Sequence, residues 1–414
     1  MQFPHLKKKI RALPTNRRRP RIFKYVTGRL DHLWYTSQIV TATFIALRMQ
    51  RDNNFDILRF LAASLVLFSH CYPLTGHEAA EPIASLTGSD SGGGLAVAIF
   101  FVISGYLITG SCKNSNGVAD YAIKRVLRLF PGLVVCVALT VLVLGAFLTT
   151  LHMWAYLHHP LTRAYLSNIW LFVRYTLPGV FESNVYPGAV NGSLWTLPVE
   201  ALMYVIVLAL GIVRALNTRV MVIFVGACWL FYFRGVLAFG LQSAVWQNNF
   251  PVAESAKLAC LFFGGSLLYL HGLRKLNRID LAMLAVFAIV AVRGTDAQHA
   301  AYITLAPLIV IALALASLGR VAQFGKHGDI SYGIYIYAFP VQQTMVHFLG
   351  NDISPLALFC ASLPVTCLLS ALSWRFVEKP ALGLKKHRAV LALERRLSGL
   401  IPVATLPAGK PARN

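Results

Sequence analysis

The chain has 414 residues, of which 57% are hydrophobic and only 13% are charged, and its formal net charge is +22. Soluble domains carry about 25% charged residues, so this composition excludes an ordinary soluble globular protein. Apolar runs recur between residues 57 and 374, and about 20 apolar residues suffice for a helix to cross a bilayer. These runs lack the period-two alternation of membrane β-barrel strands. The sequence therefore predicts an all-α, polytopic integral membrane protein.

Ten membrane-spanning helices are predicted, and most connections between them are short and polar. Their expected ranges are 57–74, 95–112, 131–150, 194–213, 220–236, 255–271, 279–293, 300–317, 330–349 and 355–374. The connection at residues 151–193 is unusually long and rich in aromatic residues, glycine and proline. It is interpreted either as a partly re-entrant lid or substrate-binding surface, or as a structured loop that packs on the bundle.

The placement of basic residues predicts the topology. Of the 38 lysines and arginines, 32 lie in residues 1–51, 113–130, 214–219, 272–278, 318–329 and 375–414. Loops rich in lysine and arginine face the cytoplasm, so both chain ends are expected on the cytoplasmic side, which fits an even number of spans. A nucleic-acid-binding protein would gather its basic residues on one face, and this distribution argues against that class. The basic tails are better suited to anionic lipid headgroups.

Three parts of the chain are expected. Residues 1–51 form a basic cytoplasmic extension, in which residues 32–47 are interpreted as an interfacial helix because basic residues flank both ends. If that segment crossed the membrane instead, the basic N-terminus would lie outside. Residues 52–382 form the membrane domain. Residues 383–414 form a basic cytoplasmic tail whose end, rich in proline and glycine, is expected to be disordered.

The first predicted span carries three polar residues. Asp56 and Arg59 lie near one end and His70 lies near the other. A separation of eleven residues corresponds to three helical turns plus about 20°, so Arg59 and His70 share one helix face, about 16 Å apart along the axis. Taken singly, an arginine can snorkel to headgroups and a histidine can be a packing residue. On a shared face, both are expected to point into the bundle, where intramembrane polar groups belong.

Two later spans also carry polar residues. Glu200, in "NGSLWTLPVEALMY", is the only carboxylate deep inside a predicted span. A buried carboxylate needs a partner or its proton, and Arg59 and His70 are the expected partners, with a structural ion pair as the alternative. Ser104 and Gly105 occupy the middle of the second span, in "AIFFVISGYLITG", where glycine usually permits close helix packing.

Arg125 and Arg128 lie three residues apart at the start of the third span, in "KRVLRLFPG". They represent either ordinary positive-inside charge or a phosphate clamp, because paired arginines match phosphate geometry. The seven cysteines are scattered without a CxxC pair and are interpreted as packing residues. GxSxG, Walker and HExxH motifs are absent, which disfavours hydrolase, ATPase and metal chemistry. A proton-coupled transporter and a transferase that uses a phosphorylated cytoplasmic donor both remain.

Six segments lie in a characteristic order between about residues 55 and 382. They are "FDILRFLAASLVLFSH", "FFVISGYLIT", "RVLRLFP", "SLWTLPVEALMY", "ISYGIYIYAFPV" and "LSWRFVEKPAL". Together they resemble the signatures of acyltransferase family 3, which includes the O-antigen, nodulation-factor and exopolysaccharide acetylases of bacteria. The resemblance implies ten spans with cytoplasmic termini in the bacterial inner membrane. It also implies transfer of an acyl group, commonly acetyl from acetyl-CoA, to a hydroxyl of a glycan or glycolipid.

The resemblance also assigns roles to single residues. His70 matches the essential histidine of the family, Arg59 its paired arginine, and Glu200 its fourth-span carboxylate. Many members have a histidine before the aromatic-proline pair of the ninth span, whereas this chain has Ala338, so any role of that histidine cannot apply here. Some members carry an appended extracellular domain; without one, acceptor binding is expected within the membrane domain and its loops.

For the donor, the phosphates of coenzyme A are expected to dock at Arg125 and Arg128, which match the double arginine of the family. Arg59, Ser104 and Gly105 are expected to complete the acyl-donor site. Acyl-CoA would be a co-substrate, and neither a metal nor a permanently bound cofactor is expected.

For the acceptor, His70 is expected to act as general base on the hydroxyl group, since histidine exchanges protons near neutral pH. Glu200 or Asp56 would orient it or balance its charge. A covalent acyl-histidine relay is the alternative. A competing transporter or flippase would favour inverted repeats and paired broken helices, which the sequence does not show, and a non-catalytic scaffold would tolerate loss of His70. The oligomeric state is left open.

Overall fold

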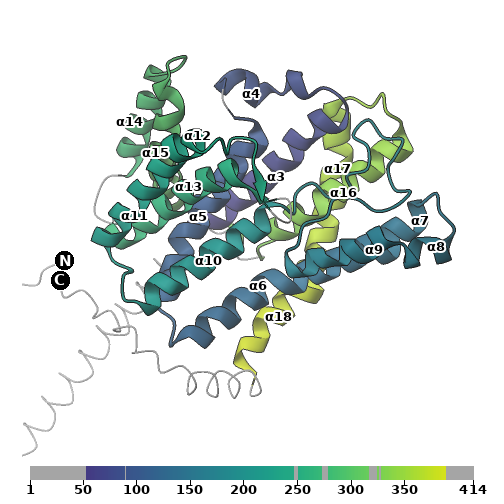
Figure 1. Cartoon of the computed structure of the whole chain (residues 1–414), viewed down its shortest axis with the longest axis horizontal. Helices are drawn as coiled ribbons and strands as arrows, with labels where there is room; N and C mark the ends of the chain where they lie inside the picture. Colours follow the sequence, from purple (N-terminus) through teal and green to yellow (C-terminus); the bar gives the residue numbers. More distant parts are fainter. Residues whose placement is uncertain are drawn as a thin grey trace, which may run out of the picture. The chain divides into compact units, whose positions relative to one another are not determined.

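The computed structural model describes residues 53–88, 90–246, 250–272, 278–316, 324–325 and 328–387. The predicted interfacial helix 32–47, the rest of the N-terminal extension, and the tail from residue 388 onward lie outside these ranges. The described chain is a bundle of α-helices with one small antiparallel hairpin, formed by β1 (Val245–Trp246) and β2 (Phe250–Pro251). Figure 1 shows the long helices and the shorter segments that connect them.

Each predicted span overlaps a helix in the described chain, although the helix that begins at Val118 starts thirteen residues before the predicted span 131–150. The helices are α3 (Phe55–Leu74), α5 (Gly92–Lys113), α6 (Val118–Leu139), α10 (Thr196–Ile212), α11 (Thr218–Leu230), α13 (Val252–His271), α14 (Arg278–Ala291), α15 (Ala297–Leu315), α16 (Ser331–Leu349) and α17 (Pro355–Ser373). Helix α6 continues through a π-helical segment, Thr140–Gly145, into α7 (Ala146–Leu148), and α17 continues through another, Trp374–Glu378, into α18 (Lys379–Gly383). A third π-helical segment, Phe231–Gly235, links α11 to α12 (Val236–Ala238).

Seven segments in the described chain are long and apolar enough to cross a membrane. They are Phe55–Leu74, Gly92–Lys113, Val118–Leu148, Thr218–Gly235, Val252–His271, Ala297–Leu315 and Pro355–Gly383. Helix α10 and residues 279–291 are shorter apolar helices. The prediction of a helical membrane protein is confirmed. The number of ten spans and the cytoplasmic location of both termini stay predictions.

Side-chain caps and polar anchors fix where the helices begin. The Asn54 amide donates hydrogen bonds to the carbonyls of Leu313 and Ala316, both at 2.8 Å, and so ties the start of α3 to the end of α15. Ser91 accepts a bond from the first turn of α5, and Ser354 does the same for α17. Such caps satisfy amide groups that have no partner inside the helix.

The long connection at residues 151–193 is a structured segment that packs on the bundle. It contains α8 (Met153–His158), α9 (Pro160–Tyr165) and a 3₁₀ turn, Leu166–Trp170. Tyr156 and Tyr165 are fully buried, and the Tyr156 hydroxyl donates to the Val141 carbonyl at 2.9 Å. These contacts favour the packed-loop interpretation over the re-entrant lid. The connection between α3 and α5 is shorter and holds α4 (Pro82–Thr87).

Helices α5 and α13 cross in close contact because each presents a glycine to the other. A Cβ atom on Gly105 would collide with the Phe262 carbonyl, and one on Gly265 would collide with the Val102 carbonyl. Gly105 lines neither of the two cavities described below. Gly105 thus has a packing role at this crossing, because close helix approach needs a residue without a side chain, and its place in the acyl-donor site stays a prediction.

We expect Gly105→Ala to destabilise the protein by about 1–3 kcal/mol, the usual cost of overpacking, because the methyl group would push α13 away. Gly226→Ala is the matched control, since a Cβ at this α11 position meets no atom within 4 Å. The measurement is the melting temperature in detergent together with abundance in the membrane. Equal behaviour of the two variants would contradict the proposed crossing.

Candidate active site

Two cavities lie inside the bundle, and the first has a cationic lining. It measures about 130 Å³ and is called the arginine cavity here. Its polar lining residues are Arg59, Ser104, Arg125, Arg128, Thr196, Glu200, Tyr204, Ser331, Tyr332 and Tyr335. They come from α3, α5, α6, α10 and α16. The structure thus brings together five of the site residues that the sequence predicted, from the four helices α3, α5, α6 and α10.

A carboxylate that the sequence did not nominate holds two of these arginines. Asp329 lies just before α16 and accepts a hydrogen bond from Arg59 at 2.7 Å and another from Arg128. Its side chain is only 12% exposed. Burial alone would raise the pKa of Asp329, but the Arg128 and Arg59 guanidiniums outweigh it and hold the pKa well below its usual range. Asp329 therefore stays ionised and ties α3, α6 and the start of α16 together.

Two further carboxylates extend this network. Asp56 pairs with Arg59 at 3.3 Å, one turn away on α3, and lines neither cavity. Glu378, in the π-helical segment after α17, lies 3.9 Å from Arg128 and is 2% exposed. The predicted orienting role of Asp56 toward His70 is corrected, because its charge is directed to Arg59 instead.

Arg125 differs from its two neighbours in the arginine cavity. No ion pair involving Arg125 occurs in the part of the chain that the structure describes, whereas Arg59 and Arg128 both have carboxylate partners. Arg125 donates a 3.3 Å hydrogen bond to Ser111 and lies 5.9 Å from the ring centroids of Tyr121 and Tyr204. Of the three arginines that line this cavity, Arg125 is thus the one whose charge has no carboxylate partner among the described residues and is available to an anionic ligand.

Glu200 belongs to the arginine cavity as well. It accepts hydrogen bonds from Ser104 at 2.8 Å and from Tyr204 at 2.5 Å. Within the described residues, neither a hydrogen bond nor an ion pair joins Glu200 to His70 or Arg59. The predicted pairing of Glu200 with these residues is therefore wrong; the first turns of α10 place the carboxylate beside α5 instead.

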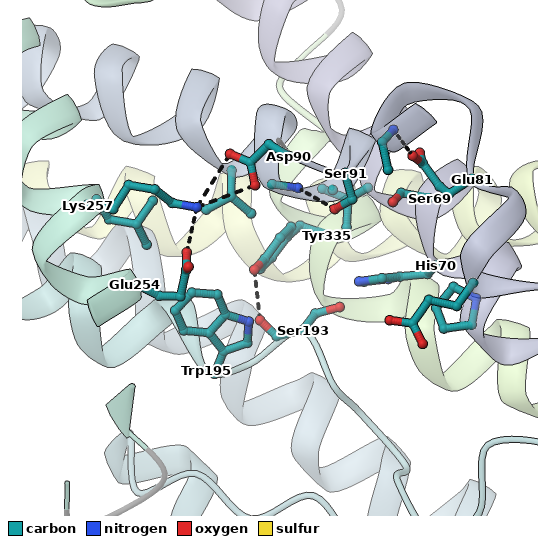
Figure 2. Close-up of a pocket in the computed structure, with 18 residues that line it drawn as sticks. Ser69, His70, Glu81, Asp90, Ser91, Ser193, Trp195, Glu254, Lys257 and Tyr335 are labelled. Carbon is teal, nitrogen blue, oxygen red and sulfur yellow. Dashed lines mark hydrogen bonds and ion pairs between the residues drawn. The ribbon is translucent and has the colours of Figure 1, made fainter. Parts of the chain in front are cut away.

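The second cavity is larger and contains His70. It measures about 440 Å³ and is called the histidine cavity here. Figure 2 shows His70 and Ser69 of α3 on one side, Ser193 and Trp195 below, and a charged group at the opposite end. Ser193 and Trp195 immediately precede α10, and neither was among the site residues predicted from the sequence.

His70 lines this cavity, and one of its ring nitrogens has no hydrogen-bond partner among the described residues. Its Nδ1 is buried and has no hydrogen-bond partner among the described residues, and the same holds for the Ser193 hydroxyl. The imidazole packs edge-on against Phe339 of α16, with ring centroids 5.2 Å apart. An unpartnered buried polar group costs about 1–3 kcal/mol, so both groups are suited to meet a polar substrate. Ala338, beside Phe339, is fully buried in the core.

The two cavities adjoin through a shared wall. Val97 of α5 and Tyr335 of α16 line both of them. The Tyr335 hydroxyl donates to the Ser193 carbonyl at 2.8 Å and shares a 2.6 Å hydrogen bond with Thr196. Arg59 therefore faces one cavity and His70 the other from the same helix, which agrees with their predicted common face. Within the described ranges, no group of three or more His, Cys, Asp or Glu side chains is placed to hold a metal.

The fold and these cavities define a polytopic helical membrane protein with a cationic chamber that adjoins a histidine-lined chamber. A family model described as an acyltransferase domain matches residues 52–375. The chain is 33% identical over 353 residues to the O-acetyl transferase of Shigella phage Sf6, covering 80% of this chain and 96% of that protein. It is 30% identical over 377 residues to Nodulation protein 10 of Rhizobium leguminosarum bv. viciae, covering 84% and 96% respectively. No solved structure matches the chain significantly.

The chain therefore belongs to acyltransferase family 3, and the protein is a membrane-bound acyltransferase. The resemblance noted in the six sequence segments is confirmed.

We expect Asp329→Ala to destabilise the protein by about 3–5 kcal/mol at neutral pH, because it leaves two largely buried guanidiniums without their shared partner. Since the pKa of Asp329 is depressed in the folded protein, its contribution is complete above the ordinary carboxyl value of about 4 and declines as the pH falls further. The difference in melting temperature between wild type and variant should therefore narrow below about pH 4.

Asp352→Asn, which neutralises an exposed carboxylate in a turn, is the control for this measurement. A difference for Asp329→Ala no larger than that of the control at pH 7 would reject the structural role of Asp329.

Proposed function

We propose that this protein transfers an acetyl group from acetyl-CoA, bound from the cytoplasmic side of the bacterial inner membrane, to a hydroxyl of a cell-surface polysaccharide or its glycolipid precursor. The observation that carries the proposal is the pair of adjoining cavities, one cationic and one with His70. The printed name of the phage relative, O-acetyl transferase, supports acetyl as the group transferred. The positive-inside distribution supports a cytoplasmic opening for the arginine cavity.

The arginine cavity has the charge and size for one end of an acyl-CoA. Phosphates are anions that guanidinium groups bind with charge-assisted hydrogen bonds, and Arg125 has no acidic partner in the described chain to compete for it. At about 130 Å³, the cavity is too small for a whole coenzyme A molecule. The nucleotide would stay at the mouth near Arg125, and the narrow pantetheine arm would extend along Ser104 toward Val97.

The histidine cavity supplies the base for acyl transfer. The acceptor hydroxyl gives its proton to His70 while its oxygen forms a bond to the thioester carbonyl carbon. The tetrahedral intermediate then collapses, the carbon–sulfur bond breaks, and the departing thiolate takes up the proton held by His70. Phe339 fixes the plane of the imidazole through its edge-on contact. Whether the acyl group moves directly or first bonds to a His70 nitrogen, it has to pass Val97 and Tyr335, since these residues line both cavities.

Two variants separate donor binding from transfer. Arg125→Ala should weaken acetyl-CoA binding to protein in nanodiscs by about 10- to 100-fold, the loss of one charge-assisted contact. His70→Ala should bind acetyl-CoA normally but lower acetylation of the surface glycan by about 10²- to 10⁴-fold, the usual contribution of a general base. Binding is measured by titration, and transfer by mass spectrometry of the glycan at equal membrane abundance.

Arg219→Ala is the charge-matched control, because Arg219 is exposed on α11 and lines neither cavity. Unaltered acetyl-CoA affinity in Arg125→Ala would reject the donor site. Wild-type acetylation by His70→Ala would reject the role of the histidine.

A further inference from the structure

The histidine cavity has a charged end that the transfer chemistry does not use. Lys257 of α13 lies 2.7 Å from Glu254 and 3.4 Å from both carboxylate oxygens of Asp90. Lys257 is only 5% exposed, and all three residues line the cavity. Figure 2 shows this charged group at the end of the cavity opposite His70, with Tyr335 between them and Trp195 beneath Glu254. The three residues are called the acceptor triad below.

Stability alone is a poor explanation for the acceptor triad. A buried ion pair usually stabilises a protein no better than well-packed apolar residues of similar size would. The Asp90 carboxylate also lies close against Gly94, where a Cβ atom would meet it. Burial raises the pKa of Asp90, although Lys257 opposes the rise. A charged group that is costly to desolvate and that faces a cavity is characteristic of a binding site.

The carboxylates of the acceptor triad have lone pairs that remain free to accept hydrogen bonds from a ligand in the cavity. The bonds between Lys257 and Asp90 are long, and a carboxylate has about four lone-pair sites whereas an ammonium has three donors. Glu254 is about half exposed, with a side-chain exposure of 48%. The three donors of the ammonium are directed at Glu254 and Asp90, whereas the carboxylates keep lone pairs that accept hydrogen bonds from hydroxyl groups. This combination suits the adjacent hydroxyls of a sugar ring.

The rest of the lining supports a sugar of this kind. Trp195 offers an aromatic face beneath the acceptor triad, and such faces pack against the apolar side of a ligand. The Ser193 hydroxyl has no partner in the described chain and lies on the same side of the cavity. At about 440 Å³, the cavity falls within the roughly 300–1,000 Å³ of small-ligand pockets.

The charge of the cavity restricts which sugar can enter. Four carboxylates line it, those of Glu78, Glu81, Asp90 and Glu254, against the single ammonium of Lys257. Both oxygens of Glu81 are occupied by backbone amides, at 2.5 Å from Ala84 and 3.1 Å from Gly92, so Glu81 contributes charge rather than binding. Like charges in a partly desolvated site repel strongly. An acidic sugar would therefore be disfavoured.

We infer that the acceptor triad, together with Trp195, is the binding site for an uncharged sugar residue of the acceptor glycan and holds it with a free hydroxyl directed at His70. This inference rests on the proposed function and adds to it the binding residues and the charge class of the acceptor. Asp90 and Glu254 accept hydrogen bonds from the sugar hydroxyls, and their negative charge excludes uronic acids and other anionic sugars.

The test uses the full chain in nanodiscs with isotopically labelled acetyl-CoA. The acceptor probe is polysaccharide fragments from a strain that lacks the gene for this protein, which have not been acetylated by it. Tandem mass spectrometry assigns the label to a sugar residue. Glu254→Gln and Asp90→Asn keep the side-chain shape while removing the charge, and Asp352→Asn, exposed in a turn outside both cavities, is the control.

Wild type is expected to label a neutral sugar. Glu254→Gln and Asp90→Asn should each raise the KM for the fragments about tenfold or more, the effect of losing a charged hydrogen-bond partner, while the KM for acetyl-CoA is unchanged. Label on an acidic sugar, or an unchanged fragment KM in both variants, would overturn the inference and leave the proposed function intact. Absence of any labelled glycan with wild type would overturn both proposals.

Discussion

The carboxylate of Asp329 is the constraint on which the arginine cavity depends. It lies between Arg59 of α3 and Arg128 of α6, immediately before α16, and hydrogen-bonds to both guanidiniums. One buried anion thus aligns three helices that are far apart in the sequence. It also divides the arginines by role, because two of them are compensated inside the protein and Arg125 keeps its charge for a ligand. Without this division, three uncompensated cations would face one small cavity.

Helix α3 connects the arginine cavity to the histidine cavity. The same helix face carries Arg59 into the arginine cavity and His70 into the histidine cavity. Val97 and Tyr335 line both cavities, so under the proposed function donor and acceptor would occupy neighbouring cavities with these two side chains between them. Under the proposed function, such a separation would limit the access of water to the thioester of the donor, where water would compete with the acceptor hydroxyl. The acidic lining of the histidine cavity thus contrasts with the basic lining of the arginine cavity.

Local pattern predicted the helices and the common face of Arg59 and His70, because both follow from apolar runs and from the helical rotation per residue. Asp329 was missed because it lies outside an apolar run and its partner Arg59 is 270 residues away. Glu378 was missed because the π-helical segment extends α17 and buries a residue that the charge pattern placed in a loop. The partner of Glu200 was assigned wrongly because a one-dimensional pattern does not show which helix lies beside α10.

Substitution at the shared wall tests most directly whether the acyl group passes between the two cavities. Val97→Phe should place a larger side chain between the two cavities while leaving the arginines in place. Val97→Ala should place a smaller one there. Acetyl-CoA binding and glycan acetylation are measured for both variants in the same nanodisc preparation. We predict that Val97→Phe binds acetyl-CoA as wild type does but no longer acetylates the glycan, whereas Val97→Ala does both. Acetylation by Val97→Phe at the wild-type rate would contradict passage through this wall.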